Sequence, residues 1–175
     1  FSTFIYNMTE IKNRVKESSL ISFEVSTLMP KKEIIEIDIK DQLWQGLVLK
    51  ERDYRHWIKT HNWEQYKGKA IFIHCSTDAI IPSWAYLLIL SSLSHHTSDC
   101  ILGSKENLLK YLIKKNINAL NLEPYIDKRV MLKGCSDGVE IDYTLFETTK
   151  AFLTVVKSLM YGEACSNVPL YKKKS

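Results

Sequence analysis

The stretch KAIFIHCSTDAIIPSWAYLLILSSLSHH, residues 69–96, decides the fold class. It begins with a short β-rich apolar run at residues 69–75, which is typical of a buried strand. Pro82 then begins a helix over residues 83–96, because the first helical turn needs no amide donor at that position. A buried strand that leads into a helix is the repeating unit of a parallel sheet covered by helices.

The same alternation continues toward the C-terminus. Strands are predicted at 99–103 and 128–134, and helices at 105–116 and 143–162. Ser104 caps the first of these helices, with Asn107 where a full capping box has Glu. Asp142 caps the second helix and Gly162 ends it. Three strand-to-helix repeats therefore favour a parallel sheet with helices on its faces.

The N-terminal part is expected to contain more strand. The predicted elements are a helix at 9–17 capped by Thr9, strands at 19–28 and 32–39, and a charged helix at 50–61. In the second strand Ile35, Ile37 and Ile39 alternate with Glu36 and Asp38, which is the period of a half-buried strand.

The fold class that follows is α/β: a mostly parallel sheet covered by helices, three-layered and Rossmann-like, with a β-rich N-terminal segment. A chain of 175 residues can bury one core without disulfides. We therefore expect a single domain over residues 1–175, with flexible ends at 1–8 and 171–175.

Composition and charge argue for a soluble protein without nucleic-acid or membrane partners. The net charge is only +4, and the terminal YKKKS supplies three positive charges. No apolar run reaches the roughly 20 residues of a membrane-spanning helix. The stretch FSTFIYNMTEIKNRV does not resemble a signal peptide, so we expect a cytoplasmic protein. Four cysteines in that compartment indicate free thiols or metal ligands rather than disulfides.

Three cysteines lie in polar, turn-forming surroundings. Cys75 and Cys135 each follow a predicted strand directly, and Cys165 follows Gly162. Because ligands bind at the carboxyl ends of parallel strands, Cys75 and Cys135 are expected at one edge of the sheet. Cys100 lies inside a strand and is expected to pack as a small apolar side chain.

Three thiolates brought together would form a site for zinc or an iron–sulfur cluster. The candidate fourth ligands are His74, Asp78 and Asp53, followed by His56 and Asp137. The paired cysteines of a zinc finger are absent from the sequence. The helix predicted at 143–162 would also carry the chain roughly 28 Å toward the opposite edge of the sheet. Too few residues then separate its end from Cys165 for the chain to return. Either that helix is not antiparallel to its strand, or a second subunit supplies Cys165 in a homodimer, or Cys165 does not belong to the cluster.

Two other functions remain open. Cys75 precedes a helix whose positive end lowers a thiol pKa, so it could act alone as a sulfur acceptor or redox thiol. Alternatively the cysteines are packed and the chain is a non-catalytic interaction module. A turnover enzyme is not favoured, because nucleotide loops and a hydrolase elbow are absent and Ile81 stands where a cysteine phosphatase needs arginine.

Five motifs resemble the bacterial domain of unknown function 2480 family over nearly the whole chain: SLISFEVSTLMP, IDIKDQLWQGLVLKERDYR, YKGKAIFIHCSTDAIIPSWAY, KGCSD and LMYGEACSNVPLYKKK. The resemblance implies cysteines at positions 75, 135 and 165, and genes that lie among those for iron–sulfur cluster assembly. It also makes Glu51 and Asp53 second-rank site candidates. We therefore predict a metal-binding accessory or carrier protein whose partners are iron–sulfur assembly proteins.

Overall fold

The computed structural model describes residues 20–134, 140–163 and 165–174. Its strands are β1 (Leu20–Glu24), β2 (Ile34–Asp38), β3 (Ala70–His74), β4 (Cys100–Leu102), β5 (Arg129–Lys133), β6 (Ser158–Glu163) and β7 (Ser166–Lys172). Its α-helices are α2 (Glu51–Thr60), α3 (Ser83–Leu93), α4 (Lys105–Asn118) and α5 (Ile141–Phe152). Short 3-10 turns are η1 (Val25–Leu28), η2 (Ile39–Gln42), η3 (Trp63–Tyr66) and η4 (Glu123–Tyr125). The predicted helix at 9–17 lies outside the described residues.

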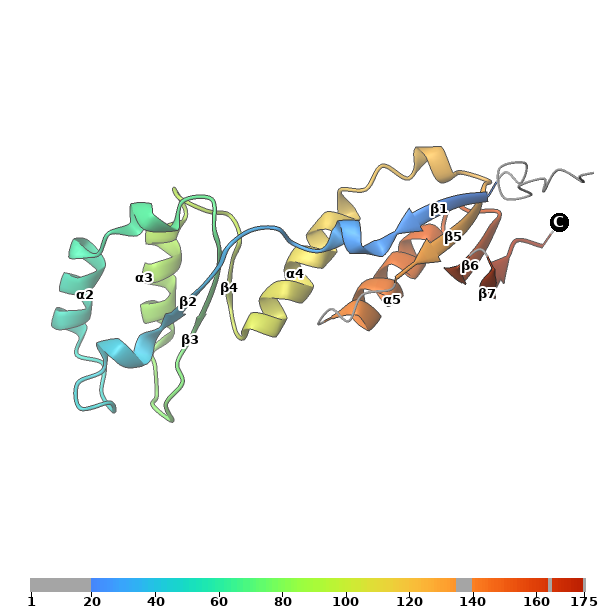
Figure 1. The fold of residues 1–175 in the computed structure, drawn as a ribbon. Helices are drawn as coiled ribbons and strands as arrows, with labels where there is room; N and C mark the ends of the chain where they lie inside the picture. Colours follow the sequence, from blue (N-terminus) through green and yellow to red (C-terminus); the bar gives the residue numbers. More distant parts are fainter. Residues whose placement is uncertain (1–19, 135–139, 164, 175) are drawn as a thin grey trace, which may run out of the picture.

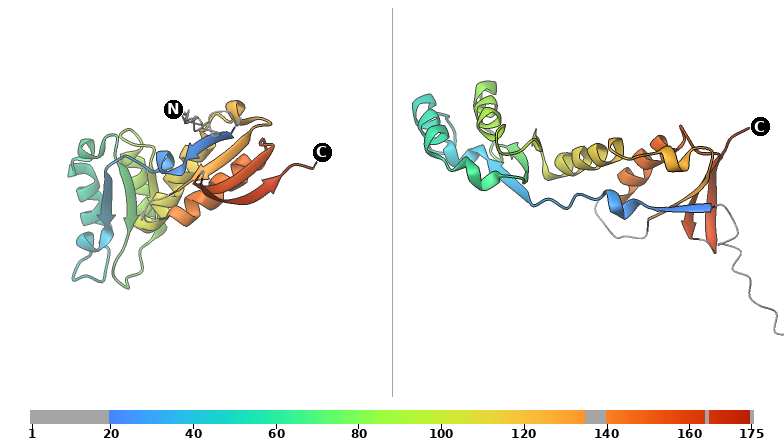
Figure 2. Two further views of the ribbon diagram at one scale, coloured as in Figure 1. Left: turned by 45° about the vertical axis from the view of Figure 1, so that its right-hand side comes forward. Right: turned by 90° about the horizontal axis from the view of Figure 1, so that it is seen from above.

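The predicted α/β class is confirmed, but the strands form two sheets rather than one. Strands β2, β3 and β4 make a parallel three-stranded sheet. The other sheet has the order β1-β5-β6-β7, in which only the last pair is antiparallel. The two sheets lie on either side of α4 (Figures 1 and 2). Sequence patterns indicate where strands lie in the chain but not which strands pair. Here β1 pairs with β5, which is far away in sequence, instead of with β2.

The three-stranded sheet is covered on both faces, as expected for three layers. Side chains of a strand alternate between its faces. Ile71 and Ile73 pack in the core that includes residues of α2 and α3. Ala70 and Phe72 face the other way and pack with Leu108 of α4. Both faces of β3 are therefore buried, which explains its continuous apolar run.

Helix α4 contributes to the cores of both sheets. Leu108 and Leu112 pack with the three-stranded sheet. Ile113 and Ile117 belong to the core of the other sheet, with Leu132 and other residues. Residues four apart share one face of a helix, and neighbours in sequence lie about 100° apart around it. The two apolar pairs therefore point toward different sheets.

The long helix predicted at 143–162 is wrong in its second half. Helix α5 ends at Phe152, and β6 begins at Ser158 beside β5. Periodicity alone cannot separate an apolar helix from a buried strand, and the pairing with β5 decides here. Asp142 lies in the first turn of α5 and Glu140 is its N-cap. The expected cap of α4 is confirmed, because Ser104 and Asn107 form a reciprocal capping box.

The C-terminal end expected to be flexible overlaps strand β7. Tyr171 and Lys172, expected in a flexible end, are the last residues of β7. Lys173 forms an ion pair with Asp127 at 2.9 Å. Within the described residues, no helix is long and apolar enough to cross a membrane.

Candidate functional site

The carboxyl edge of the three-stranded sheet gathers one imidazole and two carboxylates. Asp38 and His74 are the last residues of β2 and β3, and the parallel register places them directly opposite each other. Glu36 lies two residues before Asp38 and therefore points to the same face of the sheet. Strand alternation and register together bring these three side chains to one point.

The distances within this group are short. His74 Nε2 lies 2.5 Å from Glu36 Oε1 and 4.0 Å from Asp38 Oδ2. The three ligand atoms all lie within 4.8 Å of one another. The Asp38 side chain is only 9% exposed, whereas that of Glu36 is 55% exposed. The group is thus anchored at its base and open to solvent on the Glu36 side.

Backbone amides fix the carboxylate of Asp38. Its Oδ1 accepts hydrogen bonds from the backbone N–H of Ser76 at 3.1 Å and of Lys40 at 3.0 Å. Burial opposes the charge on Asp38, but the hydrogen bonds from Ser76 and Lys40 outweigh it and hold the pKa well below its ordinary value of 3.8. Asp38 is therefore ionised at neutral pH, and its Oδ2 faces Lys40 and His74.

Cys75 follows His74 and is partly buried against the core that includes α2 and α3. Its Sγ lies 3.3 Å from Thr77 Oγ1. Burial raises the pKa of the Tyr86 phenol, and the nearby Cys75 raises it further. Cys75 therefore packs on the face of β3 that carries Ile71 and Ile73, opposite to the face of His74 and Phe72, and its thiol does not join the three ligand atoms.

Asp78, Asp53 and His56 lie away from this group. Asp78 is exposed in the loop after β3. Asp53 is exposed on α2, where Arg52 Nε lies 3.9 Å from its carboxylate, and His56 and Glu51 are exposed on the same helix. None of these residues joins a three-ligand group within the described parts of the chain. For Asp53 and Glu51 the structure shows a solvated helix face.

Cys135 lies outside the described residues, and Cys165 follows β6, a strand of the other sheet. Cys135 and Asp137 fall in the undescribed segment 135–139. The strands that precede Cys75 and Cys135, β3 and β5, belong to different sheets, so the predicted shared sheet edge is wrong. The cause is the pairing of β5 with β1 and β6, which no local pattern encodes.

The structure explains how Cys165 can lie near the edge where β5 ends, because α5 stops at Phe152 and β6 carries the chain back. Strand β6 runs parallel to β5, and Tyr161 pairs with Leu132. The Tyr161 hydroxyl donates to the carbonyl of Gly134 at 3.4 Å. Cys165 is exposed in the turn after β6, so the chain returns to the edge where β5 ends.

Cys100 behaves as the sequence predicts. It is part of β4 and packs against the core that includes α3. Burial raises the pKa of its thiol to about 11. A thiol that stays protonated is a poor nucleophile and a poor metal ligand, so Cys100 is an internal reference for the other cysteines.

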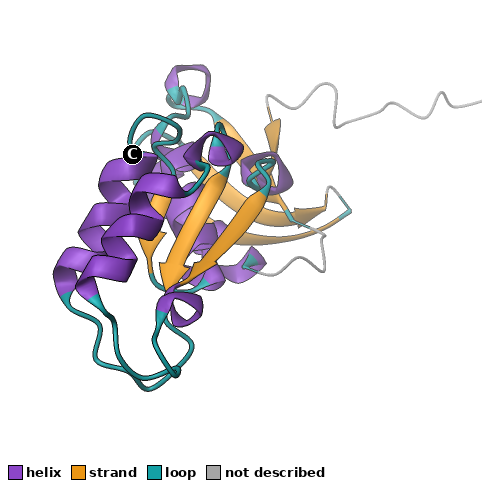
Figure 3. Ribbon diagram, turned by 90° about the vertical axis from the view of Figure 1, so that its left-hand side faces the viewer, coloured by secondary structure: helices purple, strands orange, loops and turns teal. Residues whose placement is uncertain are grey.

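Two loops with exposed apolar side chains border the site. They follow β2 and β3 in the chain and extend beyond the carboxyl edge of the sheet (Figure 3). Ile80 is 96% exposed and Leu47 is 67% exposed, and Trp44 and Val48 are half exposed. A hollow of about 490 Å³ between the loops is lined by Leu47, Val48, Asp78 and Ile80, among others. Clustered exposed apolar side chains are typical of surfaces that bind another protein.

Sequence reasoning missed the carboxylates of Glu36 and Asp38 as site residues. Their alternation with isoleucines marks them as the polar side of a strand. Only the register of β2 against β3 shows that this side carries them to His74. His74 was among the candidates because it precedes Cys75, and the structure places it at the centre of the group.

Comparison with known proteins agrees with the motifs that the sequence carries. No curated protein and no solved structure matches the chain. A match to a family extends over residues 9–173 and includes the segments that hold His74, Cys75 and the other site candidates. The chain therefore belongs to the family described as protein of unknown function (DUF2480).

Proposed function

We propose that this chain is a metal-binding accessory or carrier protein that serves iron–sulfur cluster assembly, rather than a turnover enzyme. The observation that supports it most directly is the convergence of His74, Asp38 and Glu36 at a carboxyl sheet edge, with the thiol of Cys75 next in the chain. Sheet edges of this kind are where α/β proteins bind ligands.

The donor atoms fit a zinc-like ion. Zinc bonds to imidazole nitrogen and carboxylate oxygen at about 2.0–2.2 Å, so tetrahedral donors lie roughly 3.4 Å apart. The distances from His74 Nε2, 2.5 Å to Glu36 Oε1 and 4.0 Å to Asp38 Oδ2, lie on either side of that value. A small rotation of the exposed Glu36 side chain would lengthen the distance between His74 Nε2 and Glu36 Oε1. Asp38 is already ionised and held by amides, as a metal ligand should be.

The thiols of Cys75, Cys135 and Cys165 are the proposed sulfur ligands. Cys75 follows His74 in the chain, at the carboxyl end of β3, and Cys165 lies in the turn after β6. Because Cys75 and Cys165 follow strands of different sheets, a shared site needs either both sheets of one chain or a second copy of the chain. Thiolates favour zinc and iron–sulfur clusters over hard cations.

The accessory role is supported by the loops beside the site. A carrier must dock on the protein that receives its metal, and Trp44, Leu47, Val48 and Ile80 expose apolar surface at the same sheet edge. The family resemblance implies that the receiving proteins are those of iron–sulfur assembly.

Metal analysis of protein purified without oxygen tests this proposal. We expect about one zinc ion or one iron–sulfur cluster per site in the natural chain. Cys75→Ser and His74→Ala should each remove most of the metal, and Cys135→Ser and Cys165→Ser should do the same if their thiols complete the site. Cys100→Ser is the matched control and should retain it, since that thiol is buried in the core. Trace metal only, with freely titrating thiols, would overturn the proposal.

A second candidate function is sulfur transfer through Cys75 alone. It is favoured by the partial exposure of Cys75 and by the Thr77 hydroxyl 3.3 Å from its Sγ, which can donate a hydrogen bond to a thiolate. This function predicts that Cys75→Ser abolishes persulfide loading by a cysteine desulfurase and that Cys165→Ser leaves it intact. Equal loading of the natural chain and Cys75→Ser would eliminate it.

A further inference from the structure

Strand β4 forms an open edge of the three-stranded sheet. Within the described residues it pairs only with β3. The backbone N–H of Gly103 donates to the carbonyl of Ile73 in β3 at 2.9 Å. Because the backbone groups of successive strand residues point to opposite sides, Cys100 and Leu102 direct their N–H and C=O groups away from β3. Such a row of backbone groups is a template for pairing with another strand.

The features that usually protect an edge strand are missing from β4. Charged side chains and proline on an edge discourage pairing with a second chain. The sequence of β4 is CIL, which contains neither. The other edge strands of the two sheets contain at least one: Glu24 in β1, Glu36 and Asp38 in β2, and Pro169 and Lys172 in β7. Among these edges, β4 is therefore the one best suited to accept a partner strand.

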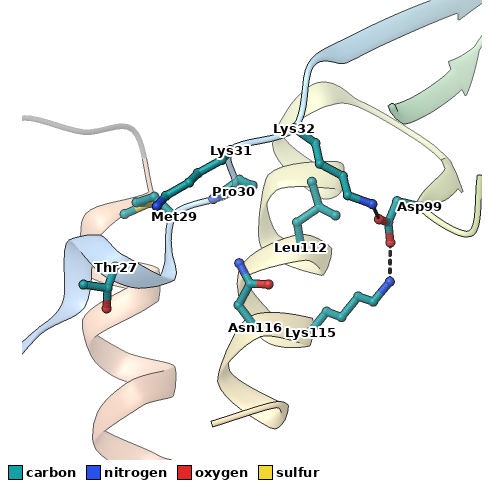
Figure 4. Close-up of a pocket in the computed structure, with 9 residues that line it drawn as sticks. All are labelled: Thr27, Met29, Pro30, Lys31, Lys32, Asp99, Leu112, Lys115 and Asn116. Atoms are coloured by element: carbon teal, nitrogen blue, oxygen red, sulfur yellow. Dashed lines mark hydrogen bonds and ion pairs between the residues drawn. The ribbon is translucent and has the colours of Figure 1, made fainter. Parts of the chain in front are cut away.

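The charged residue that precedes β4 is buried and already paired. The Asp99 side chain is only 2% exposed, and the Nζ atoms of Lys32 and Lys115 each lie 2.5 Å from a different oxygen of its carboxylate. Figure 4 shows the two lysines reaching Asp99 from opposite sides. Both carboxylate oxygens are thus occupied within one chain, so Asp99 presents no free charge to a strand that approaches β4.

The surface beside this edge is apolar and slightly hollow. Leu87 of α3 is 61% exposed, Leu102 is 63% exposed and Leu90 of α3 is about half exposed. These leucines line a hollow of about 120 Å³ together with Tyr86 and Cys100, among others. Small-molecule sites have volumes of about 300–1,000 Å³, so this hollow suits a single side chain of a protein partner instead. Neither α3 nor β4 contains a charged residue.

A second copy of the chain fits this edge. In a two-fold contact the same patch meets itself, so a charge near the axis would face its own copy, and this patch carries none. An axis at Ile101 would place Cys100 opposite Leu102 of the second copy as a hydrogen-bonded antiparallel pair. All outward N–H and C=O groups of both residues would then be satisfied. Leu102 of each copy would also lie at the hollow beside Cys100 of the other.

From this match we propose that two copies pair antiparallel through β4, which joins their three-stranded sheets into one. The axis is perpendicular to the sheet, so α3 and its copy lie on the same face and bring Leu87 and Leu90 together. The dimer does not depend on the proposed metal site, because none of the residues that form this patch belongs to the His74 group.

Sedimentation of the full-length chain tests the dimer. A reductant and a metal chelator are added, so that neither disulfides nor a shared metal can join two copies. We expect twice the mass of one chain at concentrations up to about 0.1 mM. Leu102→Lys should raise the dissociation constant about a hundredfold, since each copy then places an ammonium group at the apolar hollow of the other at a cost of about tenfold.

Ile80→Lys is the matched control, because Ile80 is also an exposed apolar residue but lies in the loop after β3. This variant should dimerise like the natural chain. The proposal is overturned if the natural chain is a monomer throughout, which would leave the β4 edge to a strand of another protein. It is also overturned if Leu102→Lys dimerises as tightly as Ile80→Lys.

A designed disulfide tests the antiparallel register. The two Ile101 residues would form a non-hydrogen-bonded pair with Cα atoms about 4.5 Å apart, within the range of about 4.4–6.8 Å that a disulfide spans. In a chain with serine at positions 75, 135 and 165, Ile101→Cys should give a covalent dimer under mild oxidation with diamide. Ile126→Cys, at an exposed position after η4, should remain a single chain on denaturing gels. Equal cross-linking of the two variants would overturn the proposed pairing.

Discussion

At the scale of single residues, Asp38 and Asp99 show how buried carboxylates organise this protein. Asp38 is held by two backbone amides and Asp99 by two lysines. The sequence indicates the polar face of β2 but gives no sign that Asp99 is buried, because its two lysine partners lie 67 and 16 residues away. Local patterns extend over a few residues, whereas these contacts depend on how the strands and helices pack.

Asp99→Asn should destabilise the fold by about 2–4 kcal/mol at pH 7, because both lysines lose their charged partner. The pKa of Asp99 is lower in the folded chain than its ordinary value of 3.8. Its stabilising effect is therefore complete above about pH 4 and is lost as the pH falls through the folded value. Urea unfolding between pH 7 and pH 2 measures this loss, which should be smaller in Asp99→Asn than in the natural chain.

Asp41→Asn is the matched control, since Asp41 is exposed. It should change the unfolding free energy by less than about 0.5 kcal/mol and keep the natural pH dependence. Asp38 and Glu147 also have lowered pKa values, so some acid destabilisation should remain in Asp99→Asn. Identical pH profiles for Asp99→Asn and the natural chain would contradict this role of Asp99.

At the scale of elements, the hairpin of β6 and β7 is where sequence reasoning and structure differ most. The run FLTVVKSLMYG was predicted as helix because its apolar residues suit both structures. Gly162, predicted as a helix end, instead lies near the end of β6 with φ of 122°. A Cβ at this glycine would lie 2.5 Å from the carbonyl oxygen of Ser166. Position 162, near the end of β6, therefore requires glycine.

Gly162→Ala should destabilise the chain by about 3 kcal/mol, since it combines backbone strain with a steric clash. Gly68→Ala is the control: its φ is also positive, at 72°, but a Cβ there would meet nothing within 4 Å. That variant should lose only about 1 kcal/mol. Thermal or urea unfolding compares the two. Equal losses would mean that the close approach of β7 to Gly162 does not restrict this position.

At the scale of the whole molecule, the α/β class could be predicted but the division into two sheets could not. The strands from 34 to 38, 70 to 74, 100 to 102 and 129 to 133 all lie within predicted strands. Which strands pair with one another depends on contacts between residues far apart in the sequence. Strand β1, for example, pairs with β5, which lies more than 100 residues later. That division separates Cys75 from the strands that precede Cys135 and Cys165. Helix α4 packs against both sheets and is the element that should make them fold as one unit.

Unfolding followed by two probes tests this coupling. All four tryptophans, Trp44, Trp57, Trp63 and Trp84, lie within the part of the chain that builds the three-stranded sheet and its helices. Tryptophan fluorescence therefore reports on that part, and far-ultraviolet circular dichroism reports on the whole chain. We expect coincident transitions, which is the two-state criterion. Leu112→Ala, a buried change in α4, should lower both midpoints together by removing about 2–4 kcal/mol. Separate transitions would show two independent domains.

The most direct test of the metal proposal is cobalt substitution of the chain purified without oxygen. Cobalt(II) binds in place of zinc, and its absorption spectrum reports on its ligands. Thiolate ligands give charge-transfer absorption in the near ultraviolet. We predict saturable cobalt binding with such a band, which should be lost in Cys75→Ser, weakened in His74→Ala and unchanged in Cys100→Ser. Absence of saturable cobalt binding, or a band that survives Cys75→Ser at full strength, would contradict it.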